Sequence, residues 1–126
     1  IIQTRITMHE QSVGYGATKI VPKGTRIVTV ASGYADGYHR ILSNQSCAYI
    51  GTHRLPLLGR VTMDMLCFDA TDVPESLAHE GAMVSLLGNQ AEITVDALAA
   101  RAHTIGYEIL TSIGPRVKRI YVEDAV

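Results

Sequence analysis

The 126-residue sequence has no tryptophan, one phenylalanine, four prolines and only two cysteines. Cys47 and Cys67 lie in separate apolar surroundings, with no histidine or cysteine at the spacing of zinc ligands, which indicates buried free thiols. The five histidines are scattered, and none forms a recognisable ligand pair. Metal chemistry is therefore not expected, and free thiols suit a reducing cytoplasm.

Charge and long apolar runs are also scarce. Eleven basic and twelve acidic residues leave a net charge of −1, so no positive field predicts binding to nucleic acid. No apolar run approaches the roughly 18 residues that a membrane span needs. Charged residues make up only 18% of the chain and apolar residues 47%, a balance that predicts an interface on part of the surface. Nucleic acid and membrane are not expected partners.

The length fits a single domain. No low-complexity tract, repeat or linker divides residues 1–126, and this size is close to the commonest for domains. The chain begins with Ile1, and no charged leader with an apolar core precedes the first patterned segment. We therefore expect one domain that is a piece of a longer polypeptide.

Short alternating or β-branched segments dominate the chain. Strands are expected at 2–8, 26–32, 47–50, 54–58, 61–69, 83–87 and 116–122, with turn residues between them. Thr94 can cap a helix from about Val95 to His103, and a second helix is expected from Ile105 to Ser112. The pattern predicts a mainly β fold, a small barrel or sandwich with one or two helices.

Tyr15 lies between two glycines in the segment 14–18, Gly-Tyr-Gly-Ala-Thr. Flanking glycines permit positive φ angles and a close approach to another surface, so the ring can project from a loop. On its own the pattern favours an ordinary tight turn. A phenol with a pKa near ~10 acts as a base at neutral pH only beside a cation that favours the phenolate. Arg40 and Arg60 are the candidate cations.

Two further segments carry polar groups among apolar ones. Arg40 ends the segment 33–40, whose Asp36-Gly37 pair predicts a hairpin turn with a solvated rim. The segment 59–65 places a glycine before an alternating strand, with Met63 and Asp64 on opposite sides. A methionine in such a strand usually fills the core, and Asp64 is expected to be a structural anchor, for which an ion pair with one of the arginines would suffice.

Together these segments resemble the C-terminal domain of alanine racemases. The chain carries, in the family's order, GYGAT at 14–18, GYADGY at 33–38, GRVTMD at 59–64, ITVDALA at 93–99, YEI at 107–109 and PRV at 115–117. The resemblance covers nearly the whole chain. It implies a small antiparallel Greek-key-like β-barrel with one or two short helices, without the family's N-terminal (β/α)8 barrel that binds pyridoxal phosphate.

The resemblance also implies roles for individual residues. Tyr15 would be the base that exchanges the α-proton of L-alanine, acting across a homodimer interface on the aldimine held by the second subunit. Arg40 would belong to the network that positions and tunes Tyr15. Met63 would offer its backbone N–H to the substrate carboxylate, next to Tyr34. Arg60 and Asp64 would surround the narrow entrance.

Two departures from the family follow from the residues present. The second base in the family is the lysine of the N-terminal barrel that also binds the cofactor, and Lys19, Lys23 and Lys118 lie in no such motif. The fragment alone is therefore expected neither to hold pyridoxal phosphate tightly nor to be active. Gly114-Pro115 stands where some members carry Ser-Tyr, so no second gating tyrosine is expected.

The implied parent converts L-alanine and D-alanine for cell-wall precursors in the bacterial cytoplasm. Its expected partners are its own N-terminal barrel and the second subunit of a homodimer. One alternative is a racemase of broader amino-acid specificity or, more distantly, an amino-acid decarboxylase, for which an interface cysteine would be typical. The Tyr15 loop favours a racemase over a decarboxylase. The other alternative is a stand-alone, non-catalytic interaction module, which would be expected to start naturally near Ile1; the absent initiator methionine argues against it.

Overall fold

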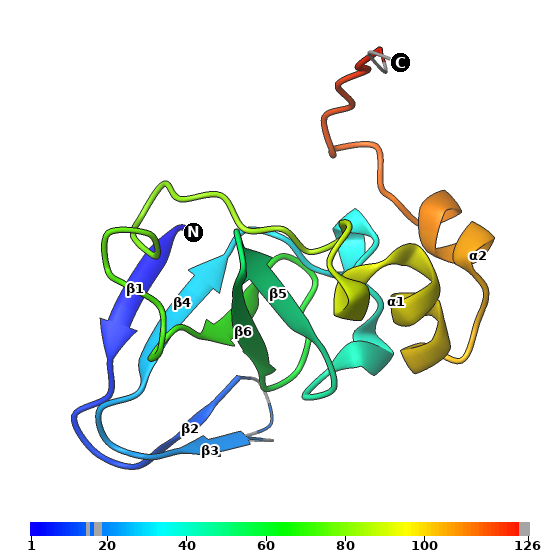
Figure 1. Cartoon of the computed structure of the whole chain (residues 1–126). Helices are drawn as coiled ribbons and strands as arrows, with labels where there is room; N and C mark the ends of the chain where they lie inside the picture. Colours follow the sequence, from blue (N-terminus) through cyan, green and yellow to red (C-terminus); the bar gives the residue numbers. More distant parts are fainter. Residues whose placement is uncertain (15, 17–18, 124–126) are drawn as a thin grey trace.

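The computed structural model describes residues 1–14, 16 and 19–123. Its main sheet has five strands in the order β1-β4-β7-β6-β5, all paired antiparallel. These strands are β1 (Gln3–Ile6), β4 (Arg26–Val30), β5 (Cys47–Ile50), β6 (His53–Leu58) and β7 (Leu66–Asp69). A separate hairpin pairs β2 (Gln11–Val13) with β3 (Lys19–Val21) and lies below the sheet in Figure 1.

The strand order is that of a Greek key. Strands β5, β6 and β7 follow one another as antiparallel neighbours, and β4, which precedes them in sequence, pairs with the far side of β7. Pairing between the edge strands β1 and β5 is not among the pairings of the described residues, so closure into a barrel stays a prediction. The mainly β, antiparallel fold with two helices is confirmed.

The core lies where β4 and β7 meet the helical end of the chain. All five residues of β4 are buried, and Val28 faces Phe68 of β7, which in turn faces Leu57 of β6. A smaller cluster of Val13, Val21, Ile27 and Leu58 joins the β2–β3 hairpin to the sheet. The hairpin that carries the segment 14–18 is therefore held by apolar packing.

Both predicted helices are confirmed, and they stand side by side at one end of the sheet (Figure 1). Helix α1 runs over Val95–Arg101 and α2 over Gly106–Thr111. The side chain of Thr94 caps α1 by accepting a hydrogen bond from the N–H of Ala97 at 3.1 Å, as predicted. Leu98 and Ile109 bury the inner faces of the two helices.

Several predicted strands are wrong. The strand predicted at 61–69 begins only at Leu66, because the Thr62 hydroxyl bridges the backbone of Met65 and forms a turn. The segment 83–87 makes only an isolated bridge between Ser85 and Tyr49. The segment 116–122 is no strand and projects from the body toward the C-terminus (Figure 1).

The structure also differs from the sequence prediction in its short helices. The segment predicted to form a hairpin turn contains the 3-10 helix η2 (Tyr34–Asp36), followed by η3 (Arg40–Leu42); a third, η4 (Ala91–Ile93), precedes α1. Over the described ranges, no helix has the length and apolar character needed to cross a bilayer. No group of three or more potential metal ligands gathers within those ranges.

Candidate active site

Two of the motif segments lie face to face at the rim of the sheet. The N–H of Tyr34 donates to the carbonyl of Thr62 at 3.0 Å, and the N–H of Ala35 donates to the carbonyl of Met63 at 3.1 Å. A Cβ atom at position 33 would lie 2.2 Å from the Thr62 carbonyl oxygen, so only glycine allows this approach. The contact fixes the segment 33–36 against the segment 62–63.

The third motif segment reaches the same place from the β2–β3 hairpin. Gly14 and Gly16 have φ angles of 80° and 77°, which favour glycine. A Cβ atom at Gly16 would lie 3.2 Å from the guanidinium carbon of Arg60. Tyr15 itself lies outside the described residues, as do Ala17 and Thr18. The described neighbours place the guanidinium of Arg60, one of the two candidate cations, directly beside the loop.

A hollow of about 290 Å³ opens between these segments, and we name it the anion hollow. It brings together four of the six predicted site residues; its lining is Tyr34, Arg40, Arg60, Val61, Thr62 and Met63. The hollow is open to solvent, because the side chains of Tyr34 and Met63 are about half exposed. Two guanidinium groups and no carboxylate line it, so it can receive an anion.

The backbone of Met63 is available to such an anion. Its carbonyl is used by Ala35, whereas its N–H donates to no acceptor among the residues that the structure describes. The side chain of Met63 is exposed and fills no core, contrary to the usual role of a methionine at this spacing. An N–H without an acceptor among the described residues, on a residue that lines the same hollow as two arginines, suits a carboxylate.

Asp64 lies outside the anion hollow and is paired with an arginine, as predicted. Its carboxylate accepts a hydrogen bond at 2.7 Å from Nη2 of Arg116, neither from Arg40 nor from Arg60. It is also half exposed, so it is not the buried anchor expected from an apolar strand. The reason is the turn at 62–65, which carries Asp64 out of the sheet toward the C-terminal segment.

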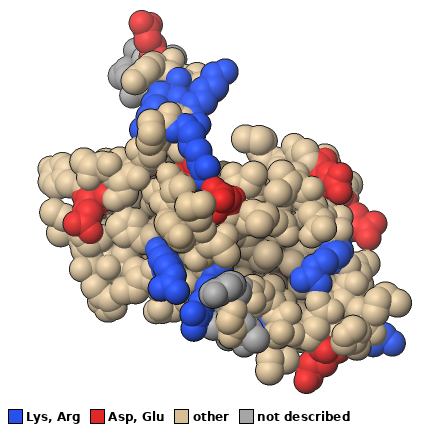
Figure 2. Space-filling model, turned by 180° about the vertical axis from the view of Figure 1, so that it is seen from behind, with Lys and Arg blue, Asp and Glu red and all other residues tan. Residues whose placement is uncertain are grey.

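Arg116 contacts three groups from two separate segments, 33–36 and 62–65. Its Nε donates to Oδ1 of Asp36 at 2.5 Å, and its Nη2 contacts Asp36, Asp64 and, at 3.5 Å, the carbonyl of Met63. The hydrogen bond from Arg116 lowers the pKa of Asp36, and the two carboxylates raise the pKa of Arg116. Figure 2 shows basic side chains along the projecting C-terminal segment and acidic side chains at its base.

Sequence reasoning missed Arg116 and Asp36 as parts of the site. Both stand in quoted motifs, PRV at 115–117 and GYADGY at 33–38, so a signal was present in the sequence. Gly33 was also overlooked, although it is the first residue of its motif. Their contacts were not predictable, because Arg116 lies far along the chain from both carboxylates and was assigned to a strand.

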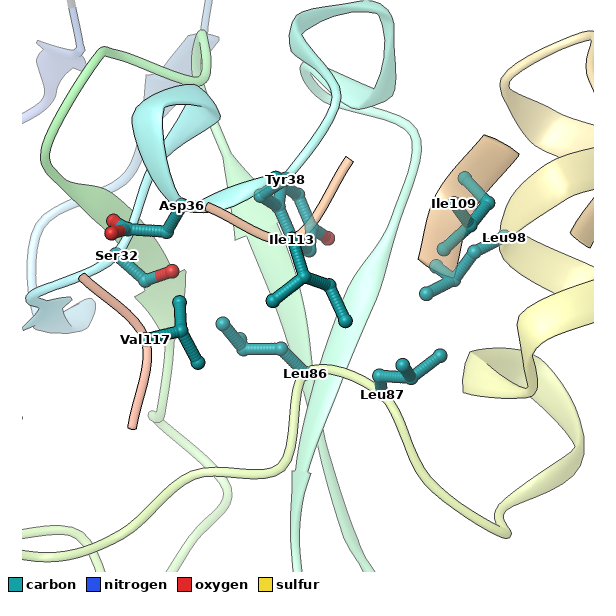
Figure 3. A pocket seen from close by; sticks show the side chains of 10 residues that line it. Ser32, Asp36, Tyr38, Leu86, Leu87, Leu98, Ile109, Ile113 and Val117 are labelled. Atoms are coloured by element: carbon teal, nitrogen blue, oxygen red, sulfur yellow. The ribbon is translucent and has the colours of Figure 1, made fainter. Parts of the chain in front are cut away.

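A second hollow, of about 190 Å³, lies on the helical side and is mostly apolar (Figure 3). Leu86, Leu98, Ile109 and other apolar side chains line it, and Figure 3 shows the carboxylate of Asp36 and the hydroxyl of Ser32 at one end. The Tyr38 hydroxyl is buried without a hydrogen-bond partner in the described part of the chain. Burial raises the pKa of Tyr38 to about 12, an effect that the nearby Ser46 hydroxyl offsets only in part.

The comparisons with known proteins agree with this arrangement. Residues 1–121 match the family described as alanine racemase, C-terminal domain. The chain belongs to the alanine racemase family. It is 50% identical over 121 residues to an alanine racemase of Rhodospirillum rubrum, covering 96% of this chain and 32% of that protein. Over 123 residues it is 41% identical to a catabolic alanine racemase of Agrobacterium fabrum, and the match covers 98% of this chain and 31% of that protein.

Solved structures of the family have the same fold as this chain. An alanine racemase of Bartonella henselae with covalently bound pyridoxal phosphate has a TM-score of 0.89 and 36% identity, with 97% of this chain and 33% of that chain covered. The biosynthetic alanine racemase of Pseudomonas aeruginosa has a TM-score of 0.85 and 43% identity, with 98% of this chain and 33% of that chain covered. The chain thus spans about a third of the length of the racemases that it matches.

The anion hollow by itself does not fit covalent anchoring of pyridoxal phosphate. That cofactor bonds to an enzyme through a lysine amine. Lys19, Lys23 and Lys118 are all exposed, and no lysine lines the hollow in the described part of the chain. The described residues therefore supply cations and a backbone donor for an anionic group, without an amine for the cofactor's aldehyde.

Proposed function

We propose that this chain is the C-terminal domain of an enzyme that interconverts L-alanine and D-alanine. Tyr15 accepts the α-proton of L-alanine and returns a proton to the same face in the reverse direction. The anion hollow receives the substrate carboxylate. The observation that carries this proposal is that the hollow, lined by Tyr34, Arg40, Arg60 and Met63, opens beside the two glycines that flank residue 15.

Each residue has a role that follows from its place. The free N–H of Met63 donates to the carboxylate, and Tyr34 forms the neighbouring wall. Arg40 positions and tunes Tyr15, because a guanidinium favours the phenolate form that a base requires. Arg60 and Asp64 surround the entrance, with Arg60 against Gly16 and Asp64 held by Arg116.

The rest of the enzyme supplies what this chain lacks. Pyridoxal phosphate, when bound, provides an electron sink that acidifies the α-carbon of an amino acid. An N-terminal (β/α)8 barrel holds this cofactor, and the second subunit of a homodimer brings its barrel to the Tyr15 loop. The 126-residue chain alone is inactive. The full enzyme acts in the bacterial cytoplasm and provides D-alanine for cell-wall precursors.

The decisive experiment substitutes Tyr15→Phe in the full-length protein. Exchange of the α-hydrogen in deuterated water, followed by NMR, should fall at least about a hundredfold for L-alanine, the usual contribution of a positioned general base. Exchange from D-alanine should fall much less, because another base serves that face. Tyr107→Phe, at an exposed position of α2, is the matched control and should leave both rates unchanged.

Equal loss for both enantiomers, or no loss for either, would contradict the role of Tyr15. A panel of other amino acids tested with the unsubstituted protein separates an alanine-specific racemase from one of broader specificity. The inactivity of the 126-residue chain is checked separately by mixing it with pyridoxal phosphate. A stable visible-wavelength adduct on one of its lysines would be evidence against a cofactor site in a separate domain.

A further inference from the structure

We propose that Arg116 is a positioning residue that orients the Met63 N–H toward the substrate carboxylate. We name the assembly of Arg116, the Asp36 and Asp64 carboxylates and the Met63 carbonyl the Arg116 clamp. This inference rests on the proposed function and extends it to a residue that does not line the anion hollow. Arg116 acts through its contacts with Met63 and Asp64, in the segment that contributes Thr62 and Met63 to the lining of the hollow.

The clamp joins parts of the chain that no strand pairing holds together. Asp36 ends η2 and its side chain is 12% exposed, so the guanidinium binds a carboxylate that is itself fixed. The other carboxylate, Asp64, directly follows Met63 in the turn at 62–65. The segment 62–65 is thus tied to η2 through Arg116 as well as through the two backbone hydrogen bonds from Tyr34 and Ala35.

These contacts hold the peptide group that follows Met63. The Met63 carbonyl accepts from Ala35 at 3.1 Å and lies 3.5 Å from Nη2 of Arg116. Asp64, on the next residue, is held at 2.7 Å by the same nitrogen. The Met63 N–H itself lies in the preceding peptide plane, whose Thr62 carbonyl accepts from Tyr34 at 3.0 Å. Arg116 holds the peptide group that follows, so the two planes that meet at Met63 are both restrained and the direction of its N–H is restricted. The exposed turn would otherwise sample several orientations.

The planar guanidinium is what allows one side chain to make these contacts. Its Nε and Nη2 reach Asp36 as a fork, while Nη2 also reaches Asp64 and the Met63 carbonyl. A lysine would keep the charge but present a single ammonium group, which cannot reproduce the fork. Arg116→Gln and Arg116→Lys therefore separate the loss of charge from the loss of geometry.

The experiment compares these two variants with Lys118→Gln in the full-length protein. Lys118 is exposed, carries the same charge and lies two positions away, so its variant reports the loss of a nearby positive charge alone. Amide hydrogen exchange of the peptide that covers residues 62–65 is measured by mass spectrometry. Steady-state kinetics with L-alanine and with D-alanine give KM and kcat for each variant.

Arg116→Gln should speed exchange in the 62–65 peptide and raise KM about tenfold for both enantiomers, the loss expected for one misdirected charge-assisted hydrogen bond. The two enantiomers should respond equally because they share the carboxylate. The kcat should change by less than about threefold if the base is undisturbed. In Arg116→Lys, log KM should stay closer to the value of Arg116→Gln than to that of the unsubstituted protein. Lys118→Gln should have the same KM as the unsubstituted protein.

Unchanged exchange at 62–65 in Arg116→Gln would overturn the clamp. So would full recovery by lysine, an equal effect of Lys118→Gln, or a fall in kcat without a rise in KM. If the unsubstituted protein does not racemise alanine, the proposed function fails, and the exchange measurement alone then decides whether Arg116 orders the segment. Faster exchange without any change in KM would show that the Met63 N–H does not bind the carboxylate, which overturns the inference.

Discussion

The sheet core and the site rim of this domain are built in different ways. We define the site rim as the segments 33–38, 59–65 and 112–117. In the core, all of β4 is buried and Phe68 and Leu55 are completely excluded from solvent. In the site rim no strand forms, and the segments are joined by backbone hydrogen bonds, close glycine contacts and the Arg116 clamp.

The sheet core is expected to provide most of the stability, and the site rim to determine the geometry of the anion hollow. Burial of apolar surface provides most of the free energy of folding, whereas half-exposed ion pairs contribute little to it. Substitutions in the core should therefore lower the free energy of unfolding most. Substitutions in the site rim should change the geometry of the anion hollow at a smaller cost in stability.

The largest effect on stability is expected for Phe68→Ala in the core. This ring is fully buried and faces both Val28 and Leu57, so its removal should leave a cavity and lower the free energy of unfolding by about 3–5 kcal/mol. Urea unfolding of the 126-residue chain, followed by circular dichroism, measures the loss. Met83→Ala, at a position 88% exposed, should change stability by less than about 0.5 kcal/mol. A similar loss of unfolding free energy in Phe68→Ala and Met83→Ala would contradict the role of the core in stability.

A smaller effect is expected for Gly33→Ala in the site rim. The new methyl group would lie 2.2 Å from the Thr62 carbonyl oxygen, so the segments 33–36 and 62–63 must separate. Overpacking of this kind costs about 1–3 kcal/mol. In the full-length protein, the affinity for alanine should fall even under conditions in which the variant stays folded. Inhibition by a carboxylate ligand measures this loss of affinity. Gly24→Asn, at a φ of 86° with no atom within 4 Å of the new Cβ, is the control for a backbone cost without a steric clash. If the carboxylate ligand inhibited Gly33→Ala as strongly as the unsubstituted protein, the segments 33–36 and 62–63 would not form one binding site.

The smallest effect concerns Asp36, and it depends on pH. Arg116 lowers the pKa of Asp36 below its unfolded value, so the folded state gains stability above about pH 4, and this gain is lost as pH falls through the folded pKa. Asp36→Asn should therefore cost about 1 kcal/mol at pH 7 and progressively less below about pH 4. Urea unfolding at several pH values checks this. Asp72→Asn, at an exposed position, is the control for loss of a surface carboxylate. A cost independent of pH would exclude the ion pair as its source.

The sequence predictions were more accurate for the buried elements than for the exposed segments. Strands β4, β5 and β6 and both helices were predicted to within a few residues, because burial imposes a periodicity that the sequence displays. The strands predicted at 83–87 and 116–122 failed. Alternation such as that of Ile120 and Val122 also occurs in exposed segments, where no neighbouring strand pairs with it. The short strands β2 and β3 were missed, since three residues are too few to show a period.

The candidate site divides in a similar way. The motifs indicated Tyr34, Arg40, Arg60 and Met63, and the structure gathers these four around one hollow. They also indicated Tyr15, whose role stays a prediction. An arginine partner was predicted for Asp64, but its identity as Arg116 was not, because the choice among arginines depends on how the C-terminal segment crosses the site rim.

The sequence by itself determined the family, the mainly β character, the two helices and four of the residues that line the anion hollow. These properties depend on local periodicity and on motifs that are contiguous in the chain. Only the tertiary structure decided that Gly33 must carry no side chain and that Arg116 joins Asp36 to Asp64. Such contacts join residues far apart in the chain, and their existence depends on distances of a few ångströms that no local pattern encodes.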